Sequence, residues 1–175
     1  GCGGVGLSVV QGARIAGASR IIAVDLRAEK MELARQFGAT DTVIPGGDSM
    51  REIFEMTGRI GVDYAFEVIG NPRTIEQCIK VVRRGGTAVL VGVGGAKERF
   101  SVSSLVLPLT GKSVIGCMYG SVNTKVDFPL YLDLYRRGRL DLDGMITRTY
   151  TLDEAPQAFE DLEQGVNARG VIVHG

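Results

Sequence analysis

The sequence predicts an α/β fold in which a doubly wound parallel sheet carries helices on both faces. Short apolar segments alternate with amphipathic ones in units of about 20–30 residues, which is the pattern of strands joined by crossover helices. The right-handed rule for such crossovers places helices on both sides of the sheet. Glycine accounts for 25 of the 175 residues, which suits tight turns between strands and helices.

The expected elements alternate along the chain. We expect helices at residues 4–18, 27–39, 48–58, 71–86, 127–140 and 151–165. We expect strands at residues 20–25, 41–44, 61–70, 87–93, 113–120, 145–150 and 170–175, with a long connection over 94–112. Local signals support several bounds: Gly38 as a helix stop, Asp48 or Ser49 as a helix cap, and Thr151 with Glu154 at the spacing of a capping box.

Composition excludes several classes of protein. Lys and Arg balance Asp and Glu at 20 each, so no overall field attracts nucleic acid or a membrane surface. Cys2, Cys78 and Cys117 lie far apart and form no C-x-x-C pair, which predicts neither a zinc knuckle nor a disulfide framework. The chain shows no signal-peptide pattern and no apolar run near the roughly 20 residues that span a bilayer. We therefore expect a cytoplasmic protein without nucleic-acid or membrane partners.

The segment GCGGVG places glycines at Gly1, Gly3 and Gly6 in the spacing G-x-G-x-x-G. A predicted helix follows at once, and the next predicted strand ends in Asp25, about 20 residues after the turn, as in dinucleotide-binding βαβ units. In such a unit the helix N-terminus faces the pyrophosphate. The alternative is an ordinary strand-to-helix turn, with Asp25 simply ending a strand.

Asp25 bears on the choice of coenzyme. A carboxylate here would accept hydrogen bonds from the ribose hydroxyls and repel a 2′-phosphate, which favours NAD over NADP. Arg27 lies two residues further on, and an arginine at this place can accommodate the additional phosphate. The sequence therefore favours NAD, with Arg27 as the opposing observation.

Five segments carry a resemblance to a known family: GCGGVG, AVDLRAEKMELARQFGAT, DYAFEVIG, GGTAVLVGVGG and GCMYGS. In order and spacing the chain resembles the zinc-dependent alcohol dehydrogenases of the medium-chain dehydrogenase/reductase superfamily along its whole length. The resemblance implies a Rossmann-type NAD-binding domain over residues 1–120. It also implies a segment over 121–175 that packs partly against a catalytic domain and otherwise exposes an apolar patch.

The resemblance also implies which residues contact the coenzyme. It assigns the pyrophosphate turn to Gly1, Gly3, Gly4, Val5 and Gly6, the adenosine side to Asp25, Lys30 and Ile69, the nicotinamide side to Val91, Val93, Met118 and Tyr119, and a further pyrophosphate contact to Arg169. Without a coenzyme, the apolar residues at strand ends would be buried core. Lys30 and Arg169 would then be ordinary surface charges.

In the family, hydride moves between an alcohol and NAD while zinc polarises the alcohol oxygen. The resemblance places the zinc ligands and the proton relay in an N-terminal catalytic domain that has no counterpart here. We therefore expect NAD as the cofactor, zinc only in that domain, no catalytic or metal-binding residue in this chain, and no activity of the chain alone. His174, the single histidine, is expected to be structural or exposed.

Further expectations follow from the resemblance. The first, central strand of the sheet should precede Gly1, so the fold is expected to lack it. The strand near residues 113–120 is expected to join homodimers or tetramers, and the substrate is expected to be a small alcohol or aldehyde. Two alternatives stay open: a zinc-free, quinone-reductase-like oxidoreductase that uses NADPH, against which Asp25 argues, and a non-catalytic NAD(H)-binding module.

Overall fold

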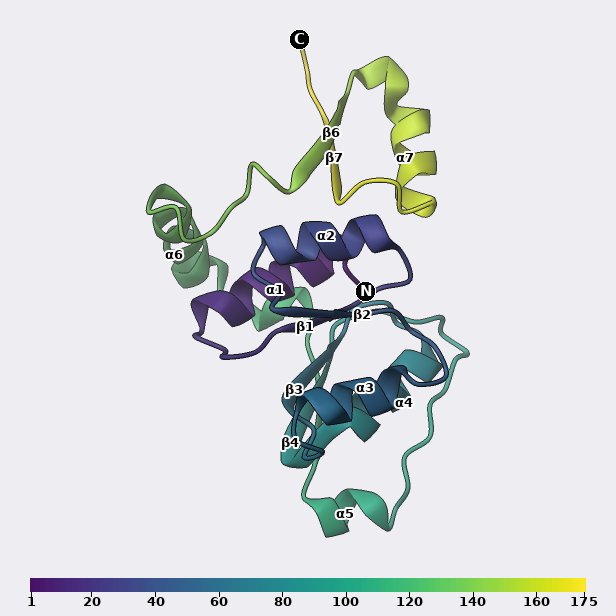
Figure 1. Cartoon of the computed structure of the whole chain (residues 1–175). Helices are drawn as coiled ribbons and strands as arrows, with labels where there is room; N and C mark the ends of the chain where they lie inside the picture. The colour runs from purple at the N-terminus through teal and green to yellow at the C-terminus, as the bar shows by residue number, and fades with distance from the viewer. The chain divides into compact units, whose positions relative to one another are not determined.

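The computed structural model describes residues 1–175, which group into two compact units. The first unit consists of Gly1 and Val43–Val122, and the second of Cys2–Thr42 and Asn123–Gly175. The strands form three small sheets, β1-β2, β3-β4-β5 and β6-β7 (Figure 1). The α/β fold with parallel strands is confirmed, although the strands are distributed over three sheets. The predicted division between residues 120 and 121 stays a prediction.

The first unit is built around a parallel three-stranded sheet with β4 at its centre. Its strands are β3 (Val62–Glu67), β4 (Val82–Leu90) and β5 (Ser113–Gly116). Its helices are α3 (Ser49–Met56), α4 (Pro72–Val81), α5 (Val106–Thr110) and the short 3₁₀ helix η1 (Tyr119–Ser121). Ile75 and Ile79 of α4 pack against Ala88 of β4 and form the core of this unit.

The helix expected at residues 71–86 is shorter than predicted. It ends at Val81, and β4 begins at the next residue, Val82, which pairs with Val62 of β3 and is buried. Strand pairing thus overrides a local pattern that favours helix. Asp48 occupies the N-cap position of α3, one of the two positions predicted, but its side chain makes no capping hydrogen bond, and the Ser49 hydroxyl donates to the Gly46 carbonyl.

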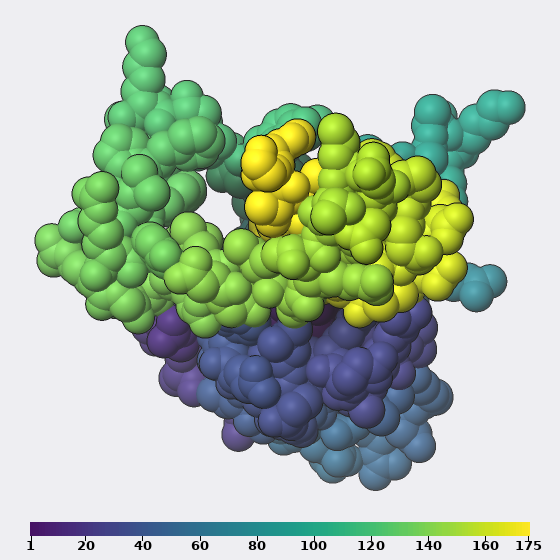
Figure 2. Space-filling model, turned by 90° about the horizontal axis from the view of Figure 1, so that it is seen from above, coloured from purple at the N-terminus to yellow at the C-terminus, as the bar shows by residue number.

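The second unit combines residues from both ends of the chain. From the first part come α1 (Gly4–Ile15), β1 (Ile22–Val24), α2 (Ala28–Gln36) and most of β2 (Asp41–Val43). From the last part come α6 (Thr124–Arg136), β6 (Ile146–Tyr150), the 3₁₀ helix η2 (Leu152–Glu154), α7 (Ala155–Glu163) and β7 (Arg169–Ile172). Figure 2 shows the atoms of the last part, in green and yellow, lying over the blue atoms of α2.

The core of the second unit joins its two parts. Leu7 and Val10 of α1 are buried together with Ala23 of β1, Phe37 at the end of α2 and Met145 before β6. The parallel pairing of β6 with β7 then brings residues 169–172 alongside 146–150. This packing fixes the last strand of the chain in the same unit as the glycine turn at its start.

Several local predictions in the second unit are confirmed. Gly38 has a positive φ of 118° after α2, as expected of a helix stop. Thr151 and Glu154 form the predicted capping box. The helix expected at 127–140 instead begins at Thr124, where the Asn123 side chain accepts a hydrogen bond from Lys125 N. No helix in the structure is both long enough and apolar enough to cross a bilayer.

Candidate functional site

The N-terminus of α1 is an open end with a positive partial charge. Gly3 occupies the N-cap position in an extended conformation, no side chain caps the helix, and its first turn holds no acidic residue. The first N–H groups of a helix have no partner within it, and the helix dipole adds positive charge there. A Cβ added to Gly3 would meet no atom within 4 Å. The end of α1 therefore has the charge and the space to hold an anion.

Asp25 lies directly after β1 and is held by two backbone N–H groups. Its Oδ2 accepts from Cys2 N at 2.7 Å and its Oδ1 from Arg27 N at 3.0 Å. Partial burial acts to raise the pKa of Asp25, but these two hydrogen bonds and the charge of Lys30 outweigh it and leave the pKa below its usual value. The carboxylate is therefore ionised and fixed in place at neutral pH.

Cys2 supplies this backbone contact and nothing reactive. The residue is 2% exposed, and burial raises the pKa of its thiol. Burial likewise raises the pKa of Cys78, to about 11. No group of three or more His, Cys, Asp or Glu side chains could hold a metal ion. The residues of this chain therefore do not fit a zinc site.

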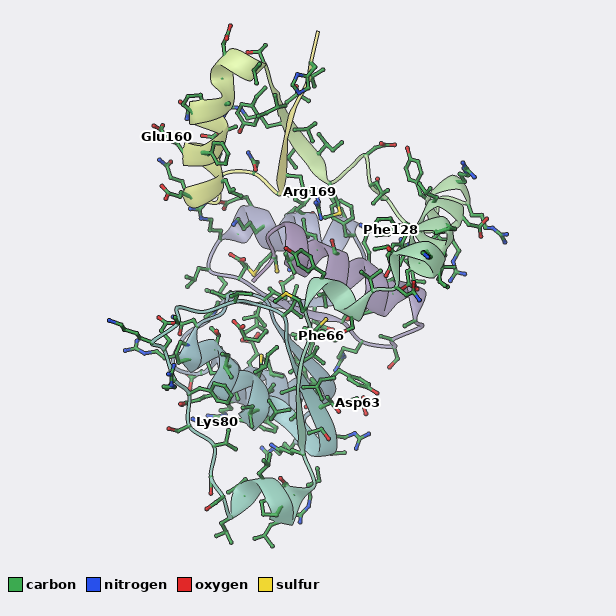
Figure 3. All side chains as sticks on the ribbon, turned by 180° about the vertical axis from the view of Figure 1, so that it is seen from behind. Asp63, Phe66, Lys80, Phe128, Glu160 and Arg169 are labelled. Atoms are coloured by element: carbon green, nitrogen blue, oxygen red, sulfur yellow. The ribbon has the colours of Figure 1, made fainter.

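Residues 164–169, which run from the end of α7 to the first residue of β7, lie against the start of α1. Ala168 O approaches Gly4 so closely that a Cβ added there would lie 2.6 Å from it. Residue 4 therefore has no room for a side chain and must be glycine for this packing. Arg169 is exposed, and its Cγ lies 3.5 Å from the same Cβ position, so its side chain starts beside the N-terminus of α1 (Figure 3).

The loop after β1 also contacts this stretch. Arg27 donates through Nη2 to Gln164 O at 2.6 Å and through Nη1 to Gly165 O at 3.0 Å. Lys30 Nζ lies 3.0 Å from the position that a Cβ on Gly165 would take. Within the second unit, Asp25, Lys30 and Arg169 are thus all close to contacts between the loop after β1 and residues 164–169.

A buried carboxylate in α7 anchors the same stretch. Asp161 is 4% exposed and accepts from Tyr150 Oη at 2.6 Å, from Arg148 Nη1 at 2.7 Å and from Gln157 Nε2 at 2.9 Å. The Tyr150 oxygen in turn accepts from Asn167 Nδ2 at 2.8 Å. The Arg148 guanidinium also lies 4.9 Å from the centre of the Tyr150 ring. Asp161 therefore connects β6, α7 and the approach to β7.

A second buried carboxylate organises the turn after β3 in the first unit. Glu67 is 2% exposed and accepts from Ile69 N at 3.0 Å, Gly70 N at 2.9 Å and Thr74 Oγ1 at 2.6 Å. Its backbone carbonyl also accepts from the N–H groups of residues 91 and 92 at 2.8 and 2.9 Å. Glu67 thus ties the turn after β3 to the turn after β4.

These two turns touch through their backbones. A Cβ on Gly92 would overlap Gly70 N, and one on Gly94 would lie 2.5 Å from Gly70 O. Gly70 itself has a φ of +85°. The contact leaves Ile69 56% and Val93 78% exposed, so the buried-core alternative for these two side chains is wrong.

The other predicted contacts occupy varied surroundings. Val91 is half-buried, Met118 is 67% exposed, and Val5 is 49% exposed in the first turn of α1. Gly6 is buried inside α1. In the first unit, a Cβ added to Gly1 would lie 3.0 Å from the Ile69 side chain. The coenzyme contacts proposed for all of these residues stay predictions.

Three functional candidates escaped the sequence analysis: Glu67, Asp161 and the contacts of the Arg27 guanidinium. Each depends on partners that no local spacing reveals. For Glu67 a signal did exist, since an acidic residue ends a strand directly before the turn Val-Ile-Gly. For Asp161 the only signal is a carboxylate at a helical position, which is usually solvent-exposed.

Parallel strands that end in glycine-rich turns, together with an open helix N-terminus and a fixed carboxylate one strand further on, are typical of a Rossmann-type α/β fold. Comparison with known proteins places the chain more narrowly. The family model described as "Zinc-binding dehydrogenase" matches residues 4–137, and the chain belongs to this family.

Similar proteins carry alcohol dehydrogenase names. The chain is 40% identical to an S-(hydroxymethyl)glutathione dehydrogenase of Synechocystis sp. over 98% of the chain and 47% of that protein. It is 37% identical to a putative alcohol dehydrogenase D of Mycobacterium tuberculosis over 99% of the chain and 48% of that protein. The chain thus spans about half the length of the curated relatives it matches.

Solved structures of alcohol dehydrogenases are similar to this chain as well. An alcohol dehydrogenase zinc-binding domain protein from Burkholderia ambifaria superposes with a TM-score of 0.94 at 32% identity, over 100% of this chain and 47% of that one. A benzyl alcohol dehydrogenase from Acinetobacter calcoaceticus superposes with a TM-score of 0.93 at 33% identity, over 98% and 47%. The resemblance to the alcohol dehydrogenase family is confirmed.

Proposed function

We propose that this chain binds NAD(H) and is the coenzyme-binding part of an NAD-dependent alcohol dehydrogenase. The observation that carries the proposal is Asp25, an ionised carboxylate fixed by two N–H groups in the same unit as the open N-terminus of α1. One group suits a ribose and the other a pyrophosphate. The names of the relatives support the dehydrogenase activity.

The residues present fit the adenosine half of this coenzyme. Gly3 leaves open space at the helix N-terminus, and each Asp25 oxygen accepts one N–H and keeps lone pairs for ribose hydroxyls. Arg169 and Lys30 add positive charge. When bound, the coenzyme would supply the nicotinamide ring that takes a hydride from an alcohol carbon. The exposed side chains of Ile69, Val93 and Met118 are proposed to bind apolar parts of the coenzyme.

The test is titration of the intact protein with NADH and with NADPH. Asp25→Ala removes hydrogen bonds to a charged group, so NADH affinity should fall about tenfold to a hundredfold, while NADPH affinity falls less or rises. Asp41→Ala is the matched control, because Asp41 is also an acidic residue in the second unit and pairs with Arg20 at 3.1 Å. Equal loss in both variants, or unchanged discrimination in Asp25→Ala, would refute the assignment.

Catalysis is a separate proposal, tested by the oxidation of simple primary alcohols by the intact protein with NAD. NADH formation that stops on removal of zinc supports the zinc-type enzyme. Coenzyme binding without turnover would favour the non-catalytic module. Turnover of quinones with NADPH would favour the zinc-free alternative.

We also propose that β5 joins copies of this chain. β5 is bonded only to β4, and Ile115 on it is 49% exposed, so the strand has a free apolar edge. Ile115→Lys should reduce the sedimentation coefficient of the intact protein, whereas Leu152→Lys, at a leucine of the second unit that is 61% exposed, should not. An unchanged sedimentation coefficient in Ile115→Lys would contradict this interface.

A further inference from the structure

We propose that Arg27 and the Asp161–Tyr150–Asn167 chain of hydrogen bonds are a positioning device that fixes residues 164–169 and thereby Arg169 against the coenzyme pyrophosphate. The inference rests on the proposed NAD(H) binding and deepens it. It assigns Arg27 to the pyrophosphate side of the site and removes it from the recognition of a 2′-phosphate.

The C-terminus of α7 is the first fixed point. Val166 N donates to Asp161 O and Gly165 N to Leu162 O, with Gly165 at a φ of +61°, which together form a Schellman motif. The two carbonyls that follow, of Gln164 and Gly165, remain available at the negative end of the helix. Arg27 binds both of them, so its positive charge also complements the helix dipole.

The second fixed point is Asn167, two residues before β7. Asn167 donates to the Tyr150 oxygen, and the Tyr150 hydroxyl donates to the buried Asp161. Ala168 N also donates to Thr147 Oγ1 at 2.9 Å. Residues 164–169 are therefore held at one end by Arg27 and at the other by the Asp161 chain, immediately before Arg169.

These hydrogen bonds bear on whether Arg27 could accommodate the 2′-phosphate of NADP. The Arg27 guanidinium is held by two hydrogen bonds to carbonyls, and turning it toward a 2′-phosphate would leave those carbonyls without their donor. Meanwhile the Arg27 backbone N–H donates to Asp25. One residue thus holds the ribose carboxylate with its backbone and residues 164–169 with its side chain.

The test is a double-mutant cycle on coenzyme affinity in the intact protein, read by NADH fluorescence. Tyr150→Phe removes the hydroxyl that joins Asn167 to Asp161. Arg27→Gln removes the guanidinium that donates to the two carbonyls. Each should weaken NADH binding about three- to tenfold. In an Arg169→Ala background each effect should shrink to less than about twofold, because the residue that they position is gone. Adenosine, which has no phosphate, should bind all variants about equally.

Matched controls exist within the same unit. Tyr135→Phe removes another tyrosine hydroxyl that donates to a carboxylate, that of Asp143 at 2.7 Å, and Arg14→Gln removes another guanidinium that donates to a carbonyl, that of Arg139 at 2.7 Å. Neither contacts residues 164–169, so both should leave NADH affinity unchanged. Thermal unfolding of every variant separates a loss of folding from a loss of positioning.

The outcomes are distinct. If Arg27→Gln weakens NADPH and NADH by the same factor, Arg27 acts through residues 164–169. A selective loss of NADPH would instead make it a 2′-phosphate receptor and overturn the inference. Purely additive effects of Tyr150→Phe and Arg169→Ala would also overturn it while leaving NAD(H) binding intact. Failure of the unaltered protein to bind NADH would overturn the proposed function as well.

Discussion

The two units hold their candidate site residues by different physical means. In the second unit, polar side chains such as Asp25, Arg27 and Asp161 each have two or more hydrogen-bond partners, many of them backbone groups. In the first unit, the exposed side chains of Ile69 and Val93 make no comparable contacts, and the turns that carry them are held by close backbone contact together with the hydrogen bonds of Glu67. Direct backbone contact between turns is thus an added feature of the first unit.

This contrast implies different sensitivities to mutation. A site fixed by hydrogen bonds should lose its function in steps, since each partner contributes about 0.5–1.5 kcal/mol, or more where a charge takes part. A site fixed by touching backbones tolerates no added atom at the contact, because backbones cannot move aside as side chains do. Mutation of a backbone contact should therefore cost more stability than loss of a single hydrogen bond.

The largest effect is expected for Gly92→Ala in the first unit. The added Cβ would overlap Gly70 N, and both partners are backbone, so relief requires the two turns to separate. We expect a loss of about 3 kcal/mol in the free energy of unfolding, at the upper end of typical overpacking costs. Gly116→Ala is the control, since nothing lies within 4 Å of a Cβ there. Urea unfolding of both variants measures the difference, and equal stability would refute the contact.

A smaller effect is expected for Glu67→Gln. The amide keeps the shape of the side chain, but one acceptor oxygen is replaced by an NH₂ group that faces the N–H donors of Ile69 and Gly70. We expect a loss of about 1–2 kcal/mol in the free energy of unfolding. Glu76→Gln, at a half-buried carboxylate that accepts from Ser101 N, should cost less. If the two variants are equally stable, side-chain hydrogen bonds do not organise this turn.

The part of the candidate site that the sequence predicts is the part whose residues lie at a characteristic spacing along the chain. The glycine turn and Asp25 lie at the two ends of the consecutive elements α1 and β1, so their separation in sequence sets their separation in space. The Arg27 guanidinium, in contrast, binds carbonyls 137 and 138 residues away, and no spacing reveals such a pair. The helix ending at Val81 shows the same limit, because pairing with β3 decides where that helix stops.

The smallest effect is expected for the pH dependence of stability that the Asp161 carboxylate contributes to the second unit. Hydrogen bonds from Tyr150 and Gln157, with the charge of Arg148, hold the pKa of Asp161 below its usual value despite its burial. A carboxyl with a lowered pKa contributes stability above the pKa of the unfolded chain, about 3.9, and that contribution is lost as the pH falls through the folded value.

The thermal midpoint, followed by the near-ultraviolet circular dichroism of the tyrosines, should therefore differ most between the unaltered protein and Asp161→Asn near pH 6. The gap should begin to close as the pH falls below about 4 and should vanish only at the lower pH at which the folded carboxyl takes up its proton. Asp153→Asn, at an acidic residue of η2 outside the network, should follow the unaltered protein throughout. A constant gap from pH 6 to pH 2 would mean that the Asp161 charge does not hold this network together, and that packing around Tyr150 alone fixes residues 164–169.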